Sequence, residues 1–358
     1  MPILLNPINY PLMKPLIDQL DSGHDLSAQQ VSSCAEFLLD ETAEIDDKAQ
    51  LLKALSGKGE TPTEIAAFVE AFLLHALDPG FNSGECNGPT IDVCGTGGDK
   101  LDLFNISTTS VFVIAGGGAC VVKHGNRGIT SKSGGADVLE ALDIAIDLST
   151  EKLRECVLEN NLGFLFAPIY HPAFKAVVPV RKQLATEGIR TVFNLIGPLL
   201  NPVRPDYQMV GVFDGSLVEP FASILGQLGR KRAWAIHGSA PGDIGIDEIS
   251  LSGTTTVSEW DGTQTNNFNF NPDDLGLGSA PLETLRGGDP TENAKILTSI
   301  LDGSERGPMR DIVALNAAAA FTVCGITNEI GAGFQLAGEI IDDGRALQKL
   351  QALREWSA

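Results

Sequence analysis

The chain is organised around residues 92–137, DVCGTGGDKLDLFNISTTSVFVIAGGGACVVKHGNRGITSKSGGAD. Short apolar runs within it favour buried strands, and each run is followed by a glycine-rich loop. Glycine lets the backbone turn tightly and bring its N–H groups close to a bound anion. We therefore expect a phosphate-binding site here, carried on an α/β body.

The first loop, GTGGD at 95–99, precedes a helix predicted to begin near Asn105. A helix start offers unpaired N–H donors and the positive end of a dipole. Asn105, Ser107 and Thr108 can cap this helix, or bind phosphate or a metal-bound water. An ordinary strand-to-helix turn is the alternative. The nucleotide fingerprints do not fit, because Lys100 stands where G-x-G-x-x-G needs its last glycine.

The second loop, from Lys123 to Gly135, strengthens the prediction of an anion site. It gathers three cations, three hydroxyl side chains and several glycines on a chain of net charge −21. A solvated basic surface loop is the alternative. A polyphosphate site is favoured, because such an anion is bound best by charge-assisted donors.

Two further features concern a metal and a carboxylate. A polyphosphate usually brings Mg²⁺, which takes oxygens from one or two carboxylates. Asp247-Glu248 follows a glycine-rich loop, 242–246, after a strand predicted to end at His237. Arg181 lies in the proline-bracketed segment 171–202, predicted to be a stiff crossover, and could fork onto a substrate carboxylate. Surface charge and pairing with nearby acids are the respective alternatives.

Composition excludes several classes of protein. With 43% apolar residues, the 358-residue chain can bury a full core. A net charge of −21 repels phosphate backbones, so nucleic-acid binding is not expected. Six scattered cysteines without a C-x-x-C pair favour reduced thiols, as in the cytoplasm. The longest apolar run, 111–122, is too short for a membrane span.

The rest of the chain predicts an α/β fold with two domains. Residues 1–84 favour a small helical domain, with capping boxes at Ser27 and Thr61. Part of 171–202 is expected to join it, and 85–358 to form a large α/β domain with a mostly parallel central sheet. The strands are expected at 91–94, 119–122, 164–167, 209–213 and 233–236, with an antiparallel hairpin within 252–271 and helix again from Arg310. An apolar stripe is expected on the helix after Thr61, formed by Ile65, Phe68, Val69, Phe72, Leu73 and Leu77.

The ordered motifs resemble those of the anthranilate phosphoribosyltransferases. They are GTGGD with FNIST, KHGNR with SKSG, FAPIYHP, RTVFNLIGPLLNP, and the acidic pair Asp247-Glu248. The resemblance covers nearly the whole chain. It implies the nucleoside phosphorylase/phosphoribosyltransferase type of fold, an active site at the hinge between domains, and a homodimer formed through the helical domain. It also implies transfer of the phosphoribosyl group from phosphoribosyl pyrophosphate (PRPP), with Mg²⁺, to anthranilate in tryptophan biosynthesis.

The resemblance also implies roles for individual residues. Those expected to bind PRPP are Gly95, Gly98, Asp99, Asn105, Ile106, Ser107, Thr108, Lys123, His124, Gly125, Asn126, Arg127, Gly128, Ile129, Thr130 and Ser131. Ser107, Asp247 and Glu248 would hold the metal. Asn126 and Arg181 would contact anthranilate, with His124 beside it in a positioning role. No catalytic base is expected, because an arylamine is already neutral near pH 7.

Some features depart from the family pattern, and some alternatives stay open. Leu103 and Gly135 replace usual hydroxyl residues, Asp143 replaces a usual glycine, and the loop 239–245 is longer than typical. A pyrimidine nucleoside phosphorylase, a transferase for another arylamine and a non-enzymatic nucleic-acid-binding relative are the alternatives. The acidic pair argues against the first, and the charge of −21 against the last.

Overall fold

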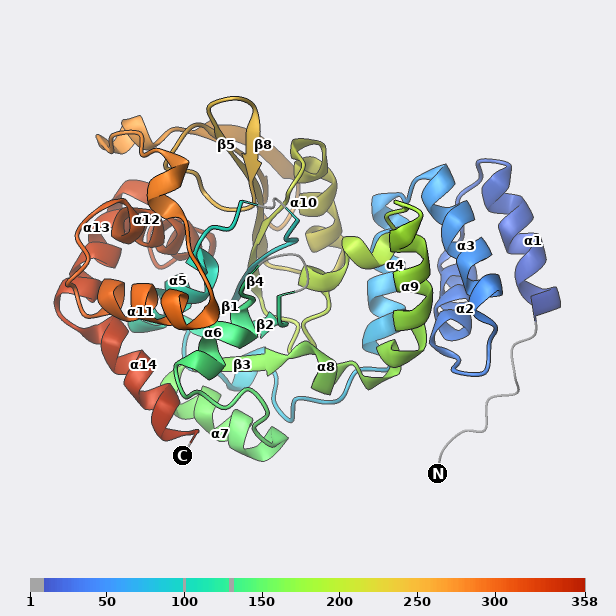
Figure 1. The fold of residues 1–358 in the computed structure, drawn as a ribbon, viewed down its shortest axis with the longest axis horizontal. Coiled ribbons are helices and arrows are strands. Elements are labelled where there is room, and N and C mark those ends of the chain that lie inside the picture. Colours follow the sequence, from blue (N-terminus) through green and yellow to red (C-terminus); the bar gives the residue numbers. More distant parts are fainter. Residues whose placement is uncertain (1–9, 99–100, 129–131, 358) are drawn as a thin grey trace. The chain divides into compact units, whose positions relative to one another are not determined.

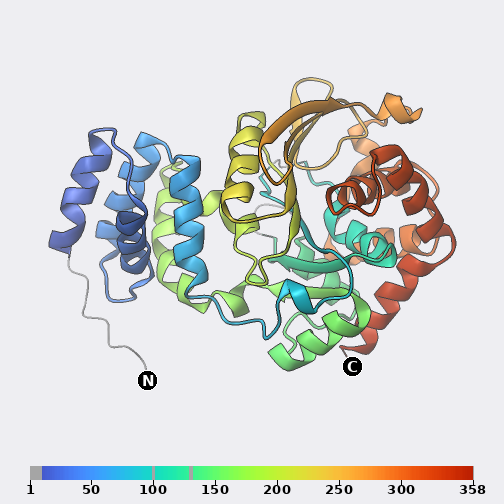
Figure 2. The ribbon, with the colours of Figure 1, turned by 180° about the vertical axis from the view of Figure 1, so that it is seen from behind.

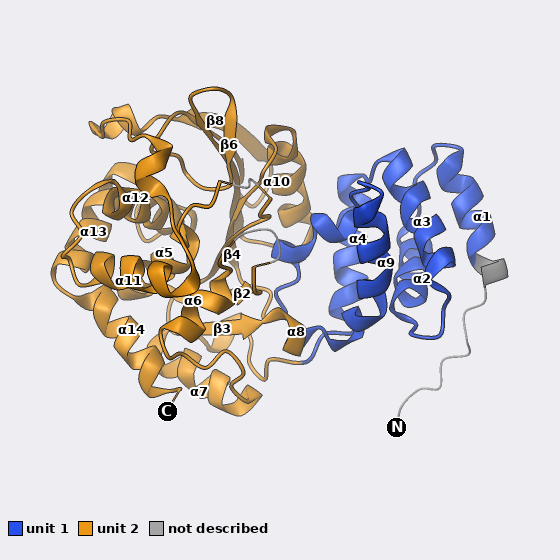
Figure 3. Ribbon diagram, viewed as in Figure 1, with its two compact units in different colours: residues 1–77, 170–202 blue, residues 78–169, 203–358 orange. Residues whose placement is uncertain are grey.

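A computed structural model describes residues 10–98, 101–128 and 132–357. The chain divides into unit 1, Met1–Leu77 with Tyr170–Pro202, and unit 2, Asp78–Ile169 with Val203–Ala358 (Figure 3). The division falls before the boundary expected near residue 85, because the intervening loop is bonded to unit 2. Within this loop the hydroxyl of Ser83 donates to Oδ1 of Asp206 at 3.4 Å, and Glu85 just beyond it pairs with Arg154 at 2.8 Å.

Unit 1 is a helical bundle (Figures 1 and 2). Its elements are α1 (Tyr10–Asp21), α2 (Ala28–Leu39), α3 (Ile45–Lys58), α4 (Pro62–Leu73), α9 (Val178–Thr186) and the short 3-10 helices η2 (Pro172–Val177), η3 (Val192–Asn194) and η4 (Gly197–Leu199). Both predicted capping boxes are confirmed, at Ser27 and at Thr61. The second segment of unit 1 enters the bundle core, where the ring of Phe72 lies 5.1 Å from Phe174 and 5.4 Å from Phe193.

Unit 1 departs from the sequence expectations in two details. The predicted apolar stripe extends too far, because α4 ends at Leu73 and Leu77 lies beyond it, 48% exposed. The segment 171–202 is not simply a stiff crossover, since it contains α9. Pro179 stands in the first turn of α9, where its missing N–H leaves no intrahelical bond unmade.

Unit 2 is built on one eight-stranded sheet of order β3-β2-β1-β4-β5-β7-β8, with β6 paired to β5. The strands are β1 (Thr90–Gly95), β2 (Cys120–Gly125), β3 (Leu162–Phe166), β4 (Tyr207–Gly211), β5 (Arg232–Ala240), β6 (Ile244–Ile246), β7 (Thr255–Trp260) and β8 (Thr265–Phe270). The first five strands pair in parallel, and the others are antiparallel. The predicted mostly parallel sheet and the hairpin within 252–271 are confirmed.

Unit 2 also contains helices, some of which pack on this sheet and others on those helices. They are α5 (Ile106–Gly116), α6 (Gly135–Ala141), α7 (Thr150–Asn160), α8 (Ala167–Tyr170), α10 (Val218–Gln227), α11 (Pro290–Leu301), α12 (Pro308–Val323), α13 (Ile330–Asp342) and α14 (Arg345–Glu355), with short 3-10 helices η1 (Ser83–Glu85), η5 (Gly215–Leu217), η6 (Pro272–Leu275) and η7 (Leu282–Leu285). No helix of the described chain is long and apolar enough to cross a membrane.

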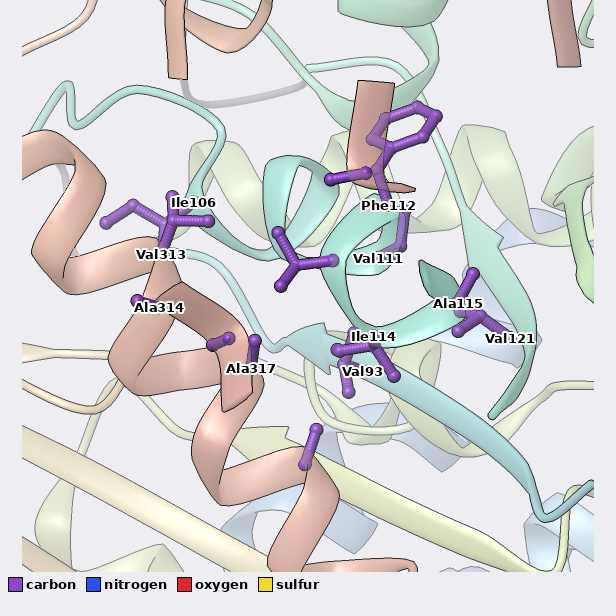
Figure 4. Close-up of a cluster of buried hydrophobic side chains, with 14 of the residues drawn as sticks. Val93, Ile106, Val111, Phe112, Ile114, Ala115, Val121, Val313, Ala314 and Ala317 are labelled. Atoms are coloured by element: carbon purple, nitrogen blue, oxygen red, sulfur yellow. The ribbon is translucent and has the colours of Figure 1, made fainter. Parts of the chain in front are cut away.

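The core of unit 2 gathers around α5. Val111, Phe112 and Ile114 of this helix are buried in one cluster with Val93 of β1, Val121 of β2 and Ala314 of the alanine-rich α12 (Figure 4). Small residues let the neighbouring helices approach closely: a Cβ added at Gly333 of α13 would lie 2.8 Å from the carbonyl oxygen of Ala318. The helix that begins at the predicted phosphate site is packed against both strands and helices.

The predicted loop 242–246 is part of a β-hairpin instead. β5 continues past His237 to Ala240, and Ile244–Ile246 returns as β6 along it. Gly242 and Asp243 make the reversal with φ of 89° and 57°, the left-handed conformation that a tight hairpin turn requires. The pairing carries the chain directly to Asp247.

Candidate active site

The predicted loops meet at the carboxyl ends of the parallel strands. β1 lies between β2 and β4 in the sheet. The chain runs from β1 to β2 and β3 on one side, and then crosses to β4 on the other side of β1. Such a reversal of strand order leaves a crevice at the strand ends, where open α/β sheets bind ligands. The loops after β1 and β2 both begin there.

The first loop is tied to β4. The N–H of Thr96 donates to the carbonyl of Gly211 at 2.8 Å, and the hydroxyl of Thr96 accepts from the N–H of Phe213 at 3.1 Å. Gly97 and Gly98 follow with φ of 67° and 95°, a conformation that glycine adopts without strain. The N–H of Gly97 is thereby directed at the carboxylate of Asp247, 2.9 Å away.

The start of α5 contributes a second N–H donor. Ser107 N–H donates to Oε1 of Glu248 at 3.1 Å, so both predicted metal ligands lie beside the predicted phosphate loops. Ile106 is only 2% exposed and its side chain belongs to the core, so only its backbone can serve a ligand. Two backbone N–H groups, of Gly97 and Ser107, thus already hold anionic oxygens.

Asn105 has a different role from helix capping. Its Nδ2 donates to the carbonyl of Ser133 at 3.1 Å, and its Oδ1 accepts from Nδ2 of Asn293 at 2.9 Å. Asn105 therefore links the two predicted loops. Asn293, on α11, could not be predicted from the sequence, because a contact across 188 positions leaves no local pattern.

Lys123 is the buried cation of the site. It is 5% exposed, and its Nζ donates to the carbonyl of Val93 at 2.7 Å and to Oγ of Ser107 at 3.4 Å. A Cβ added at Gly135 would lie 3.1 Å from Oγ1 of the buried Thr108 and 3.8 Å from Cε of Lys123. Gly135 therefore leaves space beside the side chains of Thr108 and Lys123.

The other two cations of the second loop are already paired. Arg127 forms an ion pair with Glu140, with Nη2 2.9 Å from Oε1, and lies over the ring of Phe166 at 5.4 Å. Lys132 pairs with Asp102 at 3.1 Å. The prediction of a strongly electropositive cradle is therefore wrong for these two side chains, because neighbouring acids balance them.

Asp137 shapes the second loop. Its Oδ2 accepts from the N–H groups of both Gly128 and Gly134, each at 2.8 Å. Gly134 has no room for a side chain, because a Cβ there would overlap the backbone at Gly128. Asn126 lies in the same turn, and its Oδ1 accepts from the N–H of Arg127 at 2.8 Å. Four predicted site residues, Asp99, Ile129, Thr130 and Ser131, lie outside the described residues.

His124 and Cys94 lie at the strand ends beneath these loops. His124 is 6% exposed, at the end of β2, and its N–H donates to Asp92 at 3.4 Å. Burial raises the pKa of the Cys94 thiol well above its usual value. The thiol is therefore protonated near neutral pH and is a poor nucleophile.

Arg181 belongs to unit 1, on α9. It is half-buried, its guanidinium lies 5.6 Å from the centre of the Phe193 ring, and burial lowers its pKa. An arginine held by an aromatic face keeps its fork of donors in a defined orientation. The other described site residues belong to unit 2.

The geometry fits a magnesium ion that is completed by its substrate. Asp247 and Glu248 supply two carboxylates, and in the described parts of the chain no group of three or more His, Cys, Asp or Glu residues is placed to hold an ion. Mg²⁺ takes its remaining ligands from substrate phosphates and water. The carboxylates of Asp247 and Glu248 could hold the ion, and the neighbouring N–H groups of Gly97 and Ser107 could bind phosphate oxygens.

The comparisons with known proteins first define the class. Residues 14–76 match the helical bundle domain of a glycosyl transferase family, and residues 87–347 match its a/b domain. Anthranilate phosphoribosyltransferase of Haloferax volcanii is 42% identical over 343 residues, 96% of this chain and 100% of the relative. The chain belongs to the anthranilate phosphoribosyltransferase family.

Solved structures agree with this assignment. The crystal structure of anthranilate phosphoribosyltransferase from Thermus thermophilus is 38% identical with a TM-score of 0.86, covering 95% of this chain and 98% of that one. The Saccharomyces cerevisiae enzyme in complex with PRPP and Mg is 26% identical with a TM-score of 0.85, covering 98% and 99%. The predicted fold class is confirmed.

Proposed function

We propose that the protein transfers the 5-phosphoribosyl group of PRPP to the amine of anthranilate and releases pyrophosphate, a step of tryptophan biosynthesis. The observation that carries this proposal is the meeting of Gly97 N–H, Ser107 N–H and Lys123 with the acidic pair at one edge of the sheet. Family membership supplies the acceptor, since the relatives are named for anthranilate.

The first loop and the start of α5 bind the phosphates of PRPP. The N–H groups that now donate to Asp247 and Glu248 are the donors that phosphate oxygens take. Lys123 adds a buried positive charge against the same helix start. Asn105, through its bond to Ser133, holds the second loop beside them.

Asp247 and Glu248 hold Mg²⁺ together with the substrate, and Ser107 lies close enough to Glu248 to take part. When bound, the ion supplies neutralisation of the charge that develops on the departing pyrophosphate. Lys123 and the backbone donors stabilise the same charge. These residues therefore favour the transition state in which the bond to pyrophosphate is breaking.

Arg181 binds the carboxylate of anthranilate, and Asn126 and His124 position the acceptor. The support for Arg181 is its orientation over Phe193 and its partial burial, which strengthen a bidentate bond to a carboxylate. The arylamine is neutral near pH 7, so it attacks without a strong general base. The raised pKa of the Cys94 thiol agrees with a reaction that uses no protein nucleophile.

The protein acts as a homodimer formed through unit 1. In the described chain, four of the six exposed large apolar side chains belong to this unit: Ile45, Leu74, Leu77 and Val178. A sedimenting mass near the 37.8 kDa of one chain would contradict the dimer.

Six scattered cysteines support a reducing compartment, the cytoplasm, as the place of the reaction.

The proposal is tested by following anthranilate fluorescence after adding enzyme and PRPP. We expect the signal to decay with Mg²⁺ and to stay constant with EDTA. Decay that is unchanged by EDTA would contradict the metal role. No decay, with PRPP still binding by calorimetry, would show that the acceptor is another amine.

A further inference from the structure

Asn316 is a fully buried amide in the middle of α12, between the apolar Leu315 and Ala317, with 0% exposure. A buried amide is tolerated only when its donors and acceptor are bonded. Its Oδ1 accepts from the N–H of Ile249 at 2.9 Å, and its Nδ2 donates to the carbonyls of Ile249 at 3.2 Å and Ile312 at 2.9 Å. The side chain thus bonds both backbone groups of Ile249, as a neighbouring strand would.

Ile249 directly follows the acidic pair, and the backbone of that pair is enclosed by glycines. A Cβ at Gly211 of β4 would overlap the carbonyl oxygen of Asp247, and a Cβ at Gly238 of β5 would lie 2.5 Å from the carbonyl oxygen of Glu248. The sheet supports residues 247–248 from two strands, and Asn316 holds the next residue.

The helix of Asn316 also sets the position of the helix start that Glu248 meets. α12 packs along α5, and the hydroxyl of Ser110 on α5 donates to the carbonyl of Val313 at 3.4 Å. α12 therefore bonds to the chain segment that follows Glu248, and it packs against α5, whose Ser107 N–H donates to the Glu248 carboxylate.

We infer that Asn316 is a positioning residue: it fixes Asp247 and Glu248 at the separation from α5 that a magnesium-bound diphosphate requires. The inference rests on the proposed function, because it assigns the acidic pair to the metal. Asn316 itself does not touch the reacting atoms. Its loss should weaken the magnesium-dependent part of PRPP binding and leave the acceptor site unchanged.

The test compares Asn316→Leu with Thr322→Val by calorimetric titration with PRPP, in Mg²⁺ and in EDTA. Thr322 is a matched control, 3% exposed on the same helix, with its hydroxyl bonded to the carbonyl of Ala318 at 3.0 Å. Loss of an outer-shell partner typically lowers metal affinity or activity by about 10- to 100-fold. We expect Asn316→Leu to lose about that much PRPP affinity in Mg²⁺, with affinity in EDTA and the KM for anthranilate within about twofold of the original.

Three outcomes would overturn the inference: unchanged PRPP affinity in Mg²⁺, an equal loss in Thr322→Val, or an equal rise in the KM for anthranilate. If Asn316→Leu does not fold, Asn316→Ser replaces it, because a serine hydroxyl can still bond the carbonyl of Ile312 one turn back but does not reach Ile249. Failure of the original protein to bind PRPP with Mg²⁺ would instead contradict the proposed function.

Discussion

The proposed role of Arg181 can be tested separately from the roles of the other site residues, because Arg181 would bind anthranilate and not PRPP. Arg181→Ala should raise the KM for anthranilate by about 10- to 100-fold, since a hydrogen-bonded ion pair with a carboxylate contributes about 1.5–3 kcal/mol. The KM for PRPP should stay within about twofold, because the groups proposed to bind the phosphates are Gly97, Ser107 and Lys123. Steady-state kinetics with each substrate varied in turn measures both constants.

The neighbouring Lys182, exposed on the same helix, supplies the control for that experiment. Lys182→Ala should leave both constants unchanged, and Arg181→Lys should restore only part of the anthranilate affinity, because an ammonium lacks the planar fork. An equal rise of both KM values in Arg181→Ala would contradict the assignment.

Departures from the family pattern also have explanations at the scale of single residues. Asp143 follows the last turn of α6 with φ of 59°, the left-handed position that commonly ends a helix and favours glycine or a short polar residue. Gly135 gives space to Thr108. Leu103 contributes its backbone to a bridge with Arg286 and packs against the core.

Most loop residues of the candidate site carry a local signal in the sequence, because they are glycine, hydroxyl or acidic residues that follow apolar strands. It could not predict Asn293 and Asn316, whose partners lie 188 and 67 positions away. It also could not show that Arg127 and Lys132 would be neutralised by Glu140 and Asp102. Pairing of that kind depends on the folded arrangement rather than on spacing.

Of the two strands that pack against the backbone of Asp247 and Glu248, β4 comes closer. Gly211→Ala would force the carbonyl of Asp247 to move, because a Cβ there overlaps it. Overpacking of this kind typically costs about 1–3 kcal/mol of stability, and a shift of about 1 Å at a site can reduce the rate by about 100-fold. We expect a lower unfolding temperature and much weaker PRPP binding in Mg²⁺, measured by calorimetry.

Gly278→Ala is the matched control, since a Cβ there meets no atom within 4 Å. It should leave both the unfolding temperature and PRPP binding nearly unchanged. If Gly211→Ala bound PRPP as tightly as Gly278→Ala does, the close packing of β4 against the acidic pair would have no part in the site.

Elements with strong local signals are predictable, and short or unusual ones are not. The capping boxes at Ser27 and Thr61 and the apolar strands each rest on a few adjacent residues. β6 has only three residues and forms through pairing with β5. α9 carries Pro179 in its first turn, and a proline in sequence indicates irregular chain as readily as a helix start.

At the scale of the whole molecule, the α/β class can be predicted from the alternation of apolar runs and helical patterns in the sequence. The points at which the chain passes from one unit to the other cannot be predicted in this way. The chain passes between units after Leu77, after Ile169 and after Pro202. Composition cannot mark such crossings, because the loop before β1 is as rich in glycine and proline as a linker yet bonds to unit 2.

In the proposed function, the acidic pair and the backbone donors of Gly97 and Ser107 form one magnesium-dependent PRPP site. The most direct test is the PRPP affinity of the double variant Asp247→Asn, Glu248→Gln, titrated calorimetrically in Mg²⁺ and in EDTA. We predict that Mg²⁺ strengthens binding to the original protein and no longer does so in the variant, while the backbone donors still bind PRPP weakly. The same gain from Mg²⁺ in both proteins would contradict the assignment of Asp247 and Glu248 to the metal.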